Sequence, residues 1–255
     1  MARKRTVILS AAAFLHFMPF ATPLRAQGVQ ALQELFQSEV VFPQGAGETQ
    51  VTLAPRFMAG RGFTRQEADL GVEYGLTDAW QIGAGWMGYV RDAPSVGQAA
   101  QTVGDLDFAT KYSWMDIADS RLHAALALAV AVPVASRSND LGDGQFALMP
   151  SAVLAADIPN WPGAQVFLNL GTALNDGTAH GGRHPSTLNV GAYAPVGRIT
   201  FTSEWNLSDE EGSFYTPGIV WRTPADFELG IGVPVGLNAR ADRYRVVLSV
   251  VREFE

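Results

Sequence analysis

The run of residues 122–134 constrains the fold more than any other stretch of this chain. From Leu126 to Val132 every second residue is large and apolar, and the residues between are alanines. A period of two places the bulky side chains on one face of a β-strand, whereas a helix would spread them around its circumference. The run is too short for a membrane-spanning helix, which needs ~20 apolar residues, but a tilted membrane strand needs only ~9–11. Because unpaired backbone groups in lipid are costly, such a strand requires partners that close a barrel.

The first 26 residues have the pattern of a secretion signal. Basic residues at 3–5 precede an apolar stretch at 7–20, and Ala26 is a small residue suited to cleavage. An N-terminal membrane anchor is the alternative. The apolar stretch is short and Arg25 follows it, which favours cleavage. We therefore expect residues 1–26 to be a signal peptide.

The composition excludes several classes of protein. The signal holds four of the 18 basic residues and no acidic ones, so the remaining chain would carry 14 basic against 25 acidic residues. This balance argues against nucleic acid as a partner. The chain has no cysteine, so disulfides and thiolate metal sites are excluded. We expect no cofactor, and no later stretch reaches the length of a membrane helix.

Twelve strand candidates follow the signal, most with large apolar residues on one face and polar or small residues on the other. They span residues 49–58, 65–76, 80–90, 103–114, 122–134, 145–156, 165–175, 187–194, 198–206, 214–221, 227–235 and 242–254. The stretch 145–156 is the weakest, because it is apolar on both faces.

The connections between these candidates alternate in length, with the first hairpin at 59–62 as an exception. The tight ones lie near residues 77–79, 116–120, 157–163, 195–197 and 223–226. Four tryptophans lie in or beside these tight turns: Trp80, Trp114, Trp161 and Trp221. Short periplasmic turns, longer outer loops, an even strand count and an interfacial aromatic girdle are typical of bacterial outer-membrane barrels.

The sequence therefore predicts an all-β fold, an antiparallel up-and-down transmembrane β-barrel of about 12 strands over residues 48–255. Residues 27–47 are a polar lead-in that either lies in the periplasm or plugs the lumen. A soluble β-sandwich or lipocalin-like barrel would show the same alternation. The signal, the tryptophans and the loop asymmetry together favour the outer membrane, with the lipid bilayer as the partner of the apolar face.

Charged residues on the polar faces form a predicted lumen charge network. Its members are Arg56, Arg65, Glu67, Asp69, Asp105, Asp107, Lys111, His123, Glu204, Arg243 and Arg245. Such groups must pair or stay hydrated in a narrow lumen. They brace the barrel, filter solutes by charge, or do both. Folding the chain back about Ile117 predicts that His123 lies opposite Lys111.

Other motifs carry little chemistry. Residues 83–88 spell G-x-G-x-x-G, but they continue a strand instead of opening a helix, so we expect no nucleotide site. His180 and His184 share a loop with two glycines and form no helical metal pair. A hydrolase would need a serine activated by a histidine, and Ser113 with His123 is a weak candidate pair. We expect no catalytic residues and no metal.

Two stretches, EADLGVEYGLTDAWQIGAGW at 67–86 and VGDLDFATKYSW at 103–114, resemble the outer-membrane barrel family named for the meta pathway of phenol degradation. The sequence AVPVAS at 131–136 sits where that family often leaves a strand through a proline. The resemblance implies a barrel distantly similar to long-chain fatty-acid transporters, which moves hydrophobic or aromatic compounds. The usual terminal aromatic is here penultimate, at Phe254, and the final strand would engage the barrel-assembly machinery.

Three functions stay open at this point. The first is passive uptake or efflux of small hydrophobic or aromatic compounds through a narrow lumen. The second is a structural or binding barrel whose lumen is sealed by charges. The third is an outer-membrane hydrolase. Barrels of about twelve strands lie between filled barrels of about eight and open porins of about sixteen, so we expect a narrow or plugged lumen.

Overall fold

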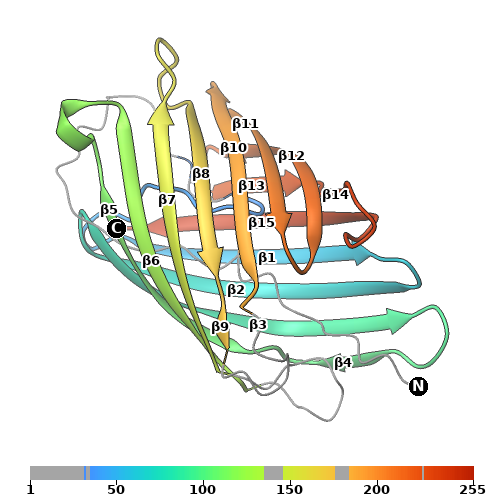
Figure 1. Ribbon diagram of the computed structural model, residues 1–255. Coiled ribbons are helices and arrows are strands. Elements are labelled where there is room, and N and C mark those ends of the chain that lie inside the picture. Colours follow the sequence, from blue (N-terminus) through green and yellow to red (C-terminus); the bar gives the residue numbers. More distant parts are fainter. Residues whose placement is uncertain (1–31, 33–34, 135–145, 176–183, 226) are drawn as a thin grey trace.

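The structure, a computed structural model, describes residue 32 and residues 35–134, 146–175, 184–225 and 227–255. The predicted signal at 1–26 and His180 lie outside them. Twelve long strands form the barrel wall (Figure 1). They are β1 (Thr49–Ala59), β2 (Phe63–Thr77), β3 (Trp80–Pro94), β5 (Leu106–Trp114), β6 (Leu122–Val132), β7 (Ala147–Asp157), β8 (Gln165–Thr172), β10 (Ser186–Val196), β11 (Ile199–Ser208), β12 (Gly212–Arg222), β13 (Phe227–Gly232) and β15 (Tyr244–Phe254).

Each of these strands pairs antiparallel with the next one along the chain, and β15 returns to pair with β1. The closing register runs from Thr49 opposite Phe254 to Ala59 opposite Tyr244. Three short strands extend the sheet, namely β4 (Ala100–Thr102), β9 (Leu174–Asn175) and β14 (Val235–Gly236). The predicted twelve-stranded up-and-down barrel is therefore confirmed, and closure leaves the wall no exposed edge.

The bulky face of each strand points outward. In β6, Leu126 and Leu128 are 52% and 38% exposed, whereas Ala125 and Ala129 are 1% and 0% exposed. A soluble barrel would place the large residues inside and the small or polar ones outside. Here the interior holds mostly polar and small side chains, with some larger apolar ones such as Phe167 and Val247, and the exterior is apolar. This arrangement suits a barrel that is surrounded by lipid.

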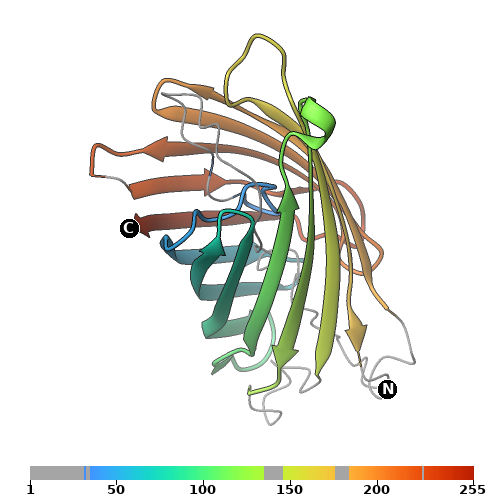
Figure 2. The same cartoon turned by 90° about the vertical axis from the view of Figure 1, so that its left-hand side faces the viewer.

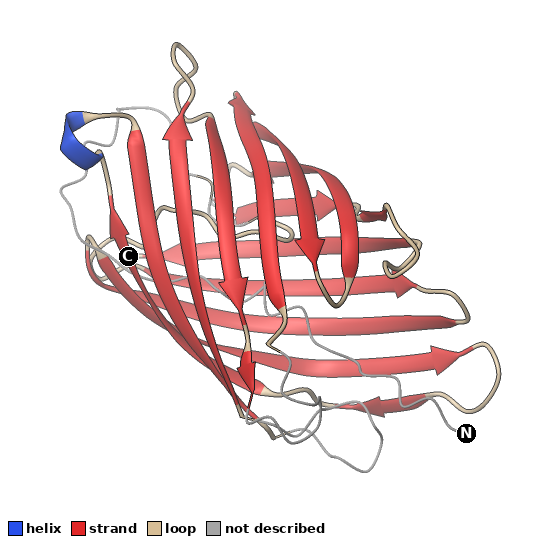
Figure 3. Cartoon of the chain, in the orientation of Figure 1, coloured by secondary structure: helices blue, strands red, loops and turns tan. Residues whose placement is uncertain are grey.

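The barrel has two different ends. We call one the short-turn end, where the strands connect through residues 78–79, 115–121, 158–164, 197–198 and 223–226. The opposite end is the loop end. Figure 3 shows the single described helical turn, at Ile117–Asp119, in the connection between β5 and β6. Among the described residues, no helix is long and apolar enough to cross a membrane.

One predicted pairing is wrong. Lys111 lies opposite Ala127, and His123 lies beyond the last paired residues, Trp114 and Ala124. The reason is the connection at 115–121, which holds the helical turn and three residues with positive φ (Asp116, Ala118 and Asp119). A longer connection shifts the register, so a fold-back about Ile117 misplaces the second strand by four residues.

Residues 35–44, here called the inner segment, lie inside the ring of strands. Figure 2 shows this blue stretch between the β-strands of the two sides of the wall. The segment joins β1 at the short-turn end, where the Gly47 amide donates to the Gly75 carbonyl at 2.8 Å. Leu35, Phe36 and Val41 are at most 5% exposed. Of the two places predicted for residues 27–47, the described part therefore occupies the interior.

Candidate functional site: the barrel interior

The first half of the inner segment is held through its main chain. Both carboxyl oxygens of Glu204 in β11 accept backbone N–H groups, from Phe36 and Gln37, each at 3.0 Å. The side-chain amide of Asn189 in β10 donates to the Gln37 carbonyl at 2.9 Å. Glu204 itself is 0% exposed. A buried carboxyl group of the wall thus satisfies the amides of a segment from the other end of the chain.

Further along, Asn169 in β8 bonds both main-chain groups of one residue. Its Oδ1 accepts the Glu39 N–H at 2.5 Å, and its Nδ2 donates to the Glu39 carbonyl at 3.2 Å. On the opposite side, Lys111 in β5 donates to the Val40 carbonyl at 2.9 Å and the Phe42 carbonyl at 3.3 Å. The Ser113 hydroxyl donates to the Val41 carbonyl at 2.8 Å. Side chains of β5, β8, β10 and β11 therefore hold residues 36–42 through their main chain.

Apolar contacts complete the fit. Leu35, Phe36, Val40 and Val41 belong to one buried cluster with interior residues of the wall. The Phe36 ring lies against glycines of β12 and β13, where a Cβ atom on Gly218 or Gly232 would collide with it. Glycine is required at these positions because the backbone and the ring approach closely. The segment is thus anchored by packing as well as by hydrogen bonds.

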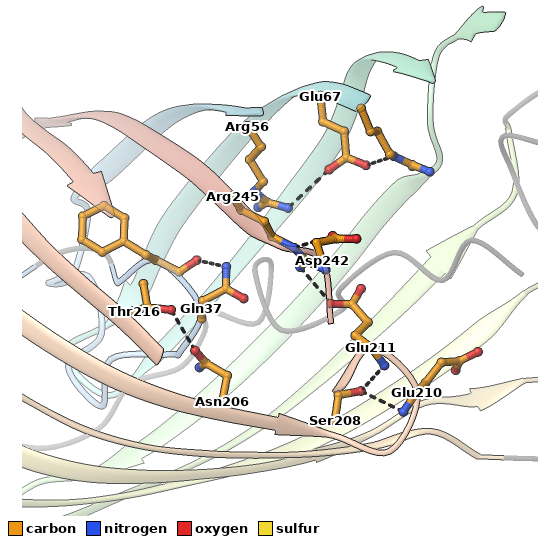
Figure 4. A network of polar contacts seen from close by, with 12 residues as sticks. Gln37, Arg56, Glu67, Asn206, Ser208, Glu210, Glu211, Thr216, Asp242 and Arg245 are labelled. Atoms are coloured by element: carbon orange, nitrogen blue, oxygen red, sulfur yellow. Dashed lines mark hydrogen bonds and ion pairs between the residues drawn. The ribbon is translucent and has the colours of Figure 1, made fainter. Parts of the chain in front are cut away.

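Toward the loop end, the interior is lined with charges. Arg56 in β1 lies 2.9 Å from the Asp69 carboxylate and 3.9 Å from that of Glu67, both in β2. Arg65 donates from Nε to the other oxygen of Glu67 at 2.5 Å. All four side chains are nearly fully buried. Figure 4 shows the Arg56–Glu67 contact on the inner face of the wall.

A second group of charges centres on Arg245 in β15. Its guanidinium lies 2.9 Å from Glu211 and 3.0 Å from Asp242 (Figure 4). It also lies over the Phe214 ring, 4.3 Å from the ring centroid. Arg243 does not join this group. It is exposed in the loop, because β15 and its inside–outside alternation begin only at Tyr244. The predicted place of Arg243 in the lumen is therefore corrected.

The remaining predicted charges occupy separate places. Asp105 and Asp107 are buried at 5% and 9% exposure on the loop-end side of β5, and an Asp105 oxygen accepts the Val134 amide at 3.1 Å. Among the described residues, the buried charged side chains comprise eight acids and four bases. The acids are Glu39, Glu67, Asp69, Glu73, Asp105, Asp107, Glu204 and Glu228, and the bases are Arg56, Arg65, Lys111 and Arg245. The interior is therefore acidic.

His123 lies at the short-turn end, and it is 3% exposed. Asp116 and Asp157 could join it in holding a metal ion. Its Nδ1 accepts the Asp116 amide at 3.0 Å, and its Nε2 lies 3.2 Å from an Asp157 oxygen without making a hydrogen bond to it. The Asp116 amide occupies Nδ1, so the ring has only Nε2 to offer a metal ion.

The contacts of Ser113 and His123 also bear on the hydrolase hypothesis. The serine hydroxyl donates to the Val41 carbonyl, whereas His123 contacts the two aspartates, so the two side chains do not form an activated pair.

The four tryptophans of the predicted girdle lie at the short-turn end, and each is 41–45% exposed: Trp80, Trp114, Trp161 and Trp221. The assignment of these four residues to a girdle stays a prediction.

Sequence reasoning missed the polar residues that hold the inner segment. Asn169 and Asn189 lie on the polar faces of their strands, but nothing in the alternation distinguishes an amide that binds a main chain from one that is hydrated. Lys111 and Glu204 were expected in a charge network, and the structure instead joins both to the inner segment. Their partners are contributed by a stretch without periodicity, which gave no signal.

No family model matches the sequence, and no curated protein matches it. Solved structures do. The COG4313 outer membrane channel from Pseudomonas putida F1 matches with a TM-score of 0.62 and 13% identity, over 84% of this chain and 98% of that one. The KdgM porin matches at 0.57 and 10%, over 81% and 99%. The β domain of the Bordetella autotransporter BrkA matches at 0.52 and 10%, over 82% and 99%. The resemblance to the meta-pathway family stays a prediction, and the likeness shows that this chain has the fold of outer-membrane β-barrels.

Proposed function

We propose that the protein is an outer-membrane channel for small solutes and that the inner segment closes it. The observation that carries this proposal is the interior itself: a largely polar wall surrounds a stretch of the protein's own chain, held by side chains of β5, β8, β10 and β11. The wall groups could be hydrated if the segment left, because amides, carboxylates and ammonium groups bind water well. The likeness to known channels and the apolar exterior support the same proposal.

The solutes we propose are small hydrophobic or aromatic compounds. This substrate class comes from the family resemblance alone. It predicts that vesicles holding the protein exchange such compounds faster than protein-free vesicles, with a hydrophilic solute of similar size as the comparison. Equal rates for every such compound tried would remove this part of the proposal while leaving the channel itself open to test.

The second candidate function is a structural or binding barrel with a sealed interior. The buried pairs of Arg56 with Asp69 and of Arg65 with Glu67 favour it, since such pairs tie neighbouring strands together. A sealed barrel would conduct no ions under any condition. The channel and the sealed barrel therefore differ in conductance.

A crosslink tests the channel. The chain has no cysteine, so the pair Val41→Cys and Ser113→Cys can be joined by a short bis-methanethiosulfonate reagent, which attaches to each thiol through a disulfide and releases methanesulfinate. We expect single-channel openings in planar bilayers before crosslinking, none after it, and their return when a reducing agent cleaves the link. Each single-cysteine variant, treated in the same way, is the control.

An opened variant complements the crosslink. Replacing Phe36, Val40 and Val41 by glycine removes the apolar anchors and leaves the wall unchanged, so we expect this variant to stay open for longer. Heat-modifiable gel migration first verifies that each barrel is folded. A folded triple variant that never conducts would refute the channel and favour the sealed barrel.

A further inference from the structure

We propose that the interior wall is a binding site for extended oligopeptides, which it recognises through their main-chain amides. The inference rests on the proposed function, because the inner segment must leave before another chain can enter. Eight main-chain contacts of residues 36–42 are made by wall side chains. Three are amide N–H groups, of Phe36, Gln37 and Glu39, and five are carbonyls, of Gln37, Glu39, Val40, Val41 and Phe42.

Asn169 shows the principle most clearly. Its carboxamide bonds the N–H and the carbonyl of the same residue, Glu39, as a paired residue of a neighbouring strand would do. Glu204 complements this by accepting two successive N–H groups. Peptide recognition by strand addition likewise derives its affinity from main-chain hydrogen bonds, which every peptide can offer.

The side chains of the segment make fewer polar contacts with the wall than its main chain does, and one of them is the hydrogen bond that the Gln44 side chain donates to Gln50 at 2.6 Å. Glu39 lies 3.7 Å from the Lys111 ammonium group and accepts a hydrogen bond from Ser151 at 3.2 Å. The Gln37 side chain bonds its own neighbour, the carbonyl of Phe36, instead of the wall. The polar part of the site is therefore directed at features that do not depend on the sequence of the ligand.

The site also sets the length of its ligand. The contacts run from β11 through β10 and β8, and then across to β5. Seven extended residues span at most roughly 25 Å, so a peptide of about this length can reach all of these groups. When the segment leaves, Asn169, Asn189 and Glu204 lose their partners, and a second main chain restores the same hydrogen bonds.

Binding of synthetic peptides to the full chain tests the proposal. The receptor is the opened variant with glycine at Phe36, Val40 and Val41, and the probe is a fluorescent, end-blocked peptide with the sequence of residues 35–44. A second peptide carries alanine in place of Gln37, Ser38 and Glu39. A third is N-methylated at the amides of Gln37 and Glu39, which removes two donors. Fluorescence anisotropy in detergent gives each dissociation constant.

We expect the native and alanine-substituted peptides to bind with dissociation constants within about threefold of each other, and the N-methylated peptide to bind at least about tenfold more weakly. In the wall, Asn169→Leu should weaken the first two peptides in parallel. Asn206→Leu is the matched control, because Asn206 also faces the interior but accepts a hydrogen bond from Thr216. Residual binding of the resident segment lowers all affinities alike and leaves these ratios intact.

Two results would overturn the proposal. Equal binding of the N-methylated peptide would show partition into detergent or apolar contact alone, and weak binding of the alanine-substituted peptide would show recognition of side chains. If the triple variant is not folded, the single variant Phe36→Gly replaces it as receptor. Conductance of the same variant is recorded separately. Peptide binding without conductance refutes the channel only, whereas conductance without amide-dependent binding refutes this inference only.

Discussion

Arg56 illustrates how a single charged residue is accommodated in the interior. It is 5% exposed, and it faces Asp69 and Glu67 on the neighbouring strand, with Glu67 directly opposite in the register. Alternation along β1 predicted that Arg56 faces inward. Which acidic residue pairs with Arg56 depends on the register between β1 and β2, and the sequence does not specify that register to within one residue.

Substituting Arg56 tests whether this pairing stabilises the barrel. Arg56→Met removes the cation beside Asp69, which is 1% exposed. Breaking a buried pair by removing one partner leaves an uncompensated buried charge, so we expect the free energy of unfolding to fall by about 3–5 kcal/mol. Denaturant-induced unfolding in vesicles, followed by tryptophan fluorescence, measures the change.

The control for this substitution is Arg198→Met, at an exposed arginine in the turn between β10 and β11. Exposed substitutions usually change stability by within about 0.5 kcal/mol. If both variants unfold at the same denaturant concentration, the buried pairs do not brace the wall. Their role would then be confined to setting the charge of the interior.

At the scale of elements, the strands were predictable because a barrel wall imposes a period of two on every one of them. Most of the twelve were found from alternation, β6 most clearly, where leucines and valines alternate with alanines, whereas the stretch that forms β7 is apolar on both faces. Their pairing was less predictable. The register of β5 with β6 depends on the seven-residue connection at 115–121, whose positive φ values no pattern indicated.

The inner segment, in contrast to the strands, could not be placed from the sequence. Residues 35–44 have no period and form no strand or helix, so the sequence left two locations open for them. Their place is fixed by hydrogen bonds to strands up to 168 residues away, such as that between the Phe36 amide and Glu204. Such long-range contacts form only when the barrel closes, so no pattern in the local sequence predicts them.

The outward face of β6 yields a prediction at this scale. Leu128 lies midway along the strand on the exposed apolar face, and Val196 lies on the same kind of face at the short-turn end of β10. Arginine on the lipid-facing side costs about 2–4 kcal/mol at the midplane and about 0–1 near the interface. We therefore expect Leu128→Arg to destabilise the barrel clearly more than Val196→Arg in vesicles. Equal effects would mean that this face is not at the membrane midplane.

At the scale of the whole molecule, the interior has two layers. The inner segment runs from the middle of the barrel, where Asn189 and Glu204 hold it, to the short-turn end, where Lys111, Ser113 and Gln81 contact it. The charge groups of Arg56 and Arg245 lie on the loop side. A solute would meet the two layers in series. In the proposed channel, the first layer would leave with the inner segment, whereas the second is part of the wall and would set the selectivity of the open state.

The sign of that selectivity follows from the buried charges. The described interior holds eight acids and four bases, and loss of the inner segment removes only one of the acids, Glu39. Charges of one sign in a narrow passage with low-dielectric walls focus the electrostatic potential and enrich counter-ions. We therefore expect the opened variant to pass potassium in preference to chloride, with a reversal potential of the cation-selective sign across a KCl gradient.

Asp105 and Asp107 are the residues through which this prediction is tested, because they are buried on the loop side of the inner segment. Asp105→Asn with Asp107→Asn should move the reversal potential toward zero. Asp119→Asn with Glu255→Gln removes the same charge from exposed sites outside the lumen and should leave it unchanged. Raising the salt from ~0.1 M to ~1 M shortens the screening length from about 10 Å to about 3 Å, so the preference should weaken. If the channel prefers chloride, or if the reversal potential is the same with and without the two aspartates, charges at other positions control the passage of ions.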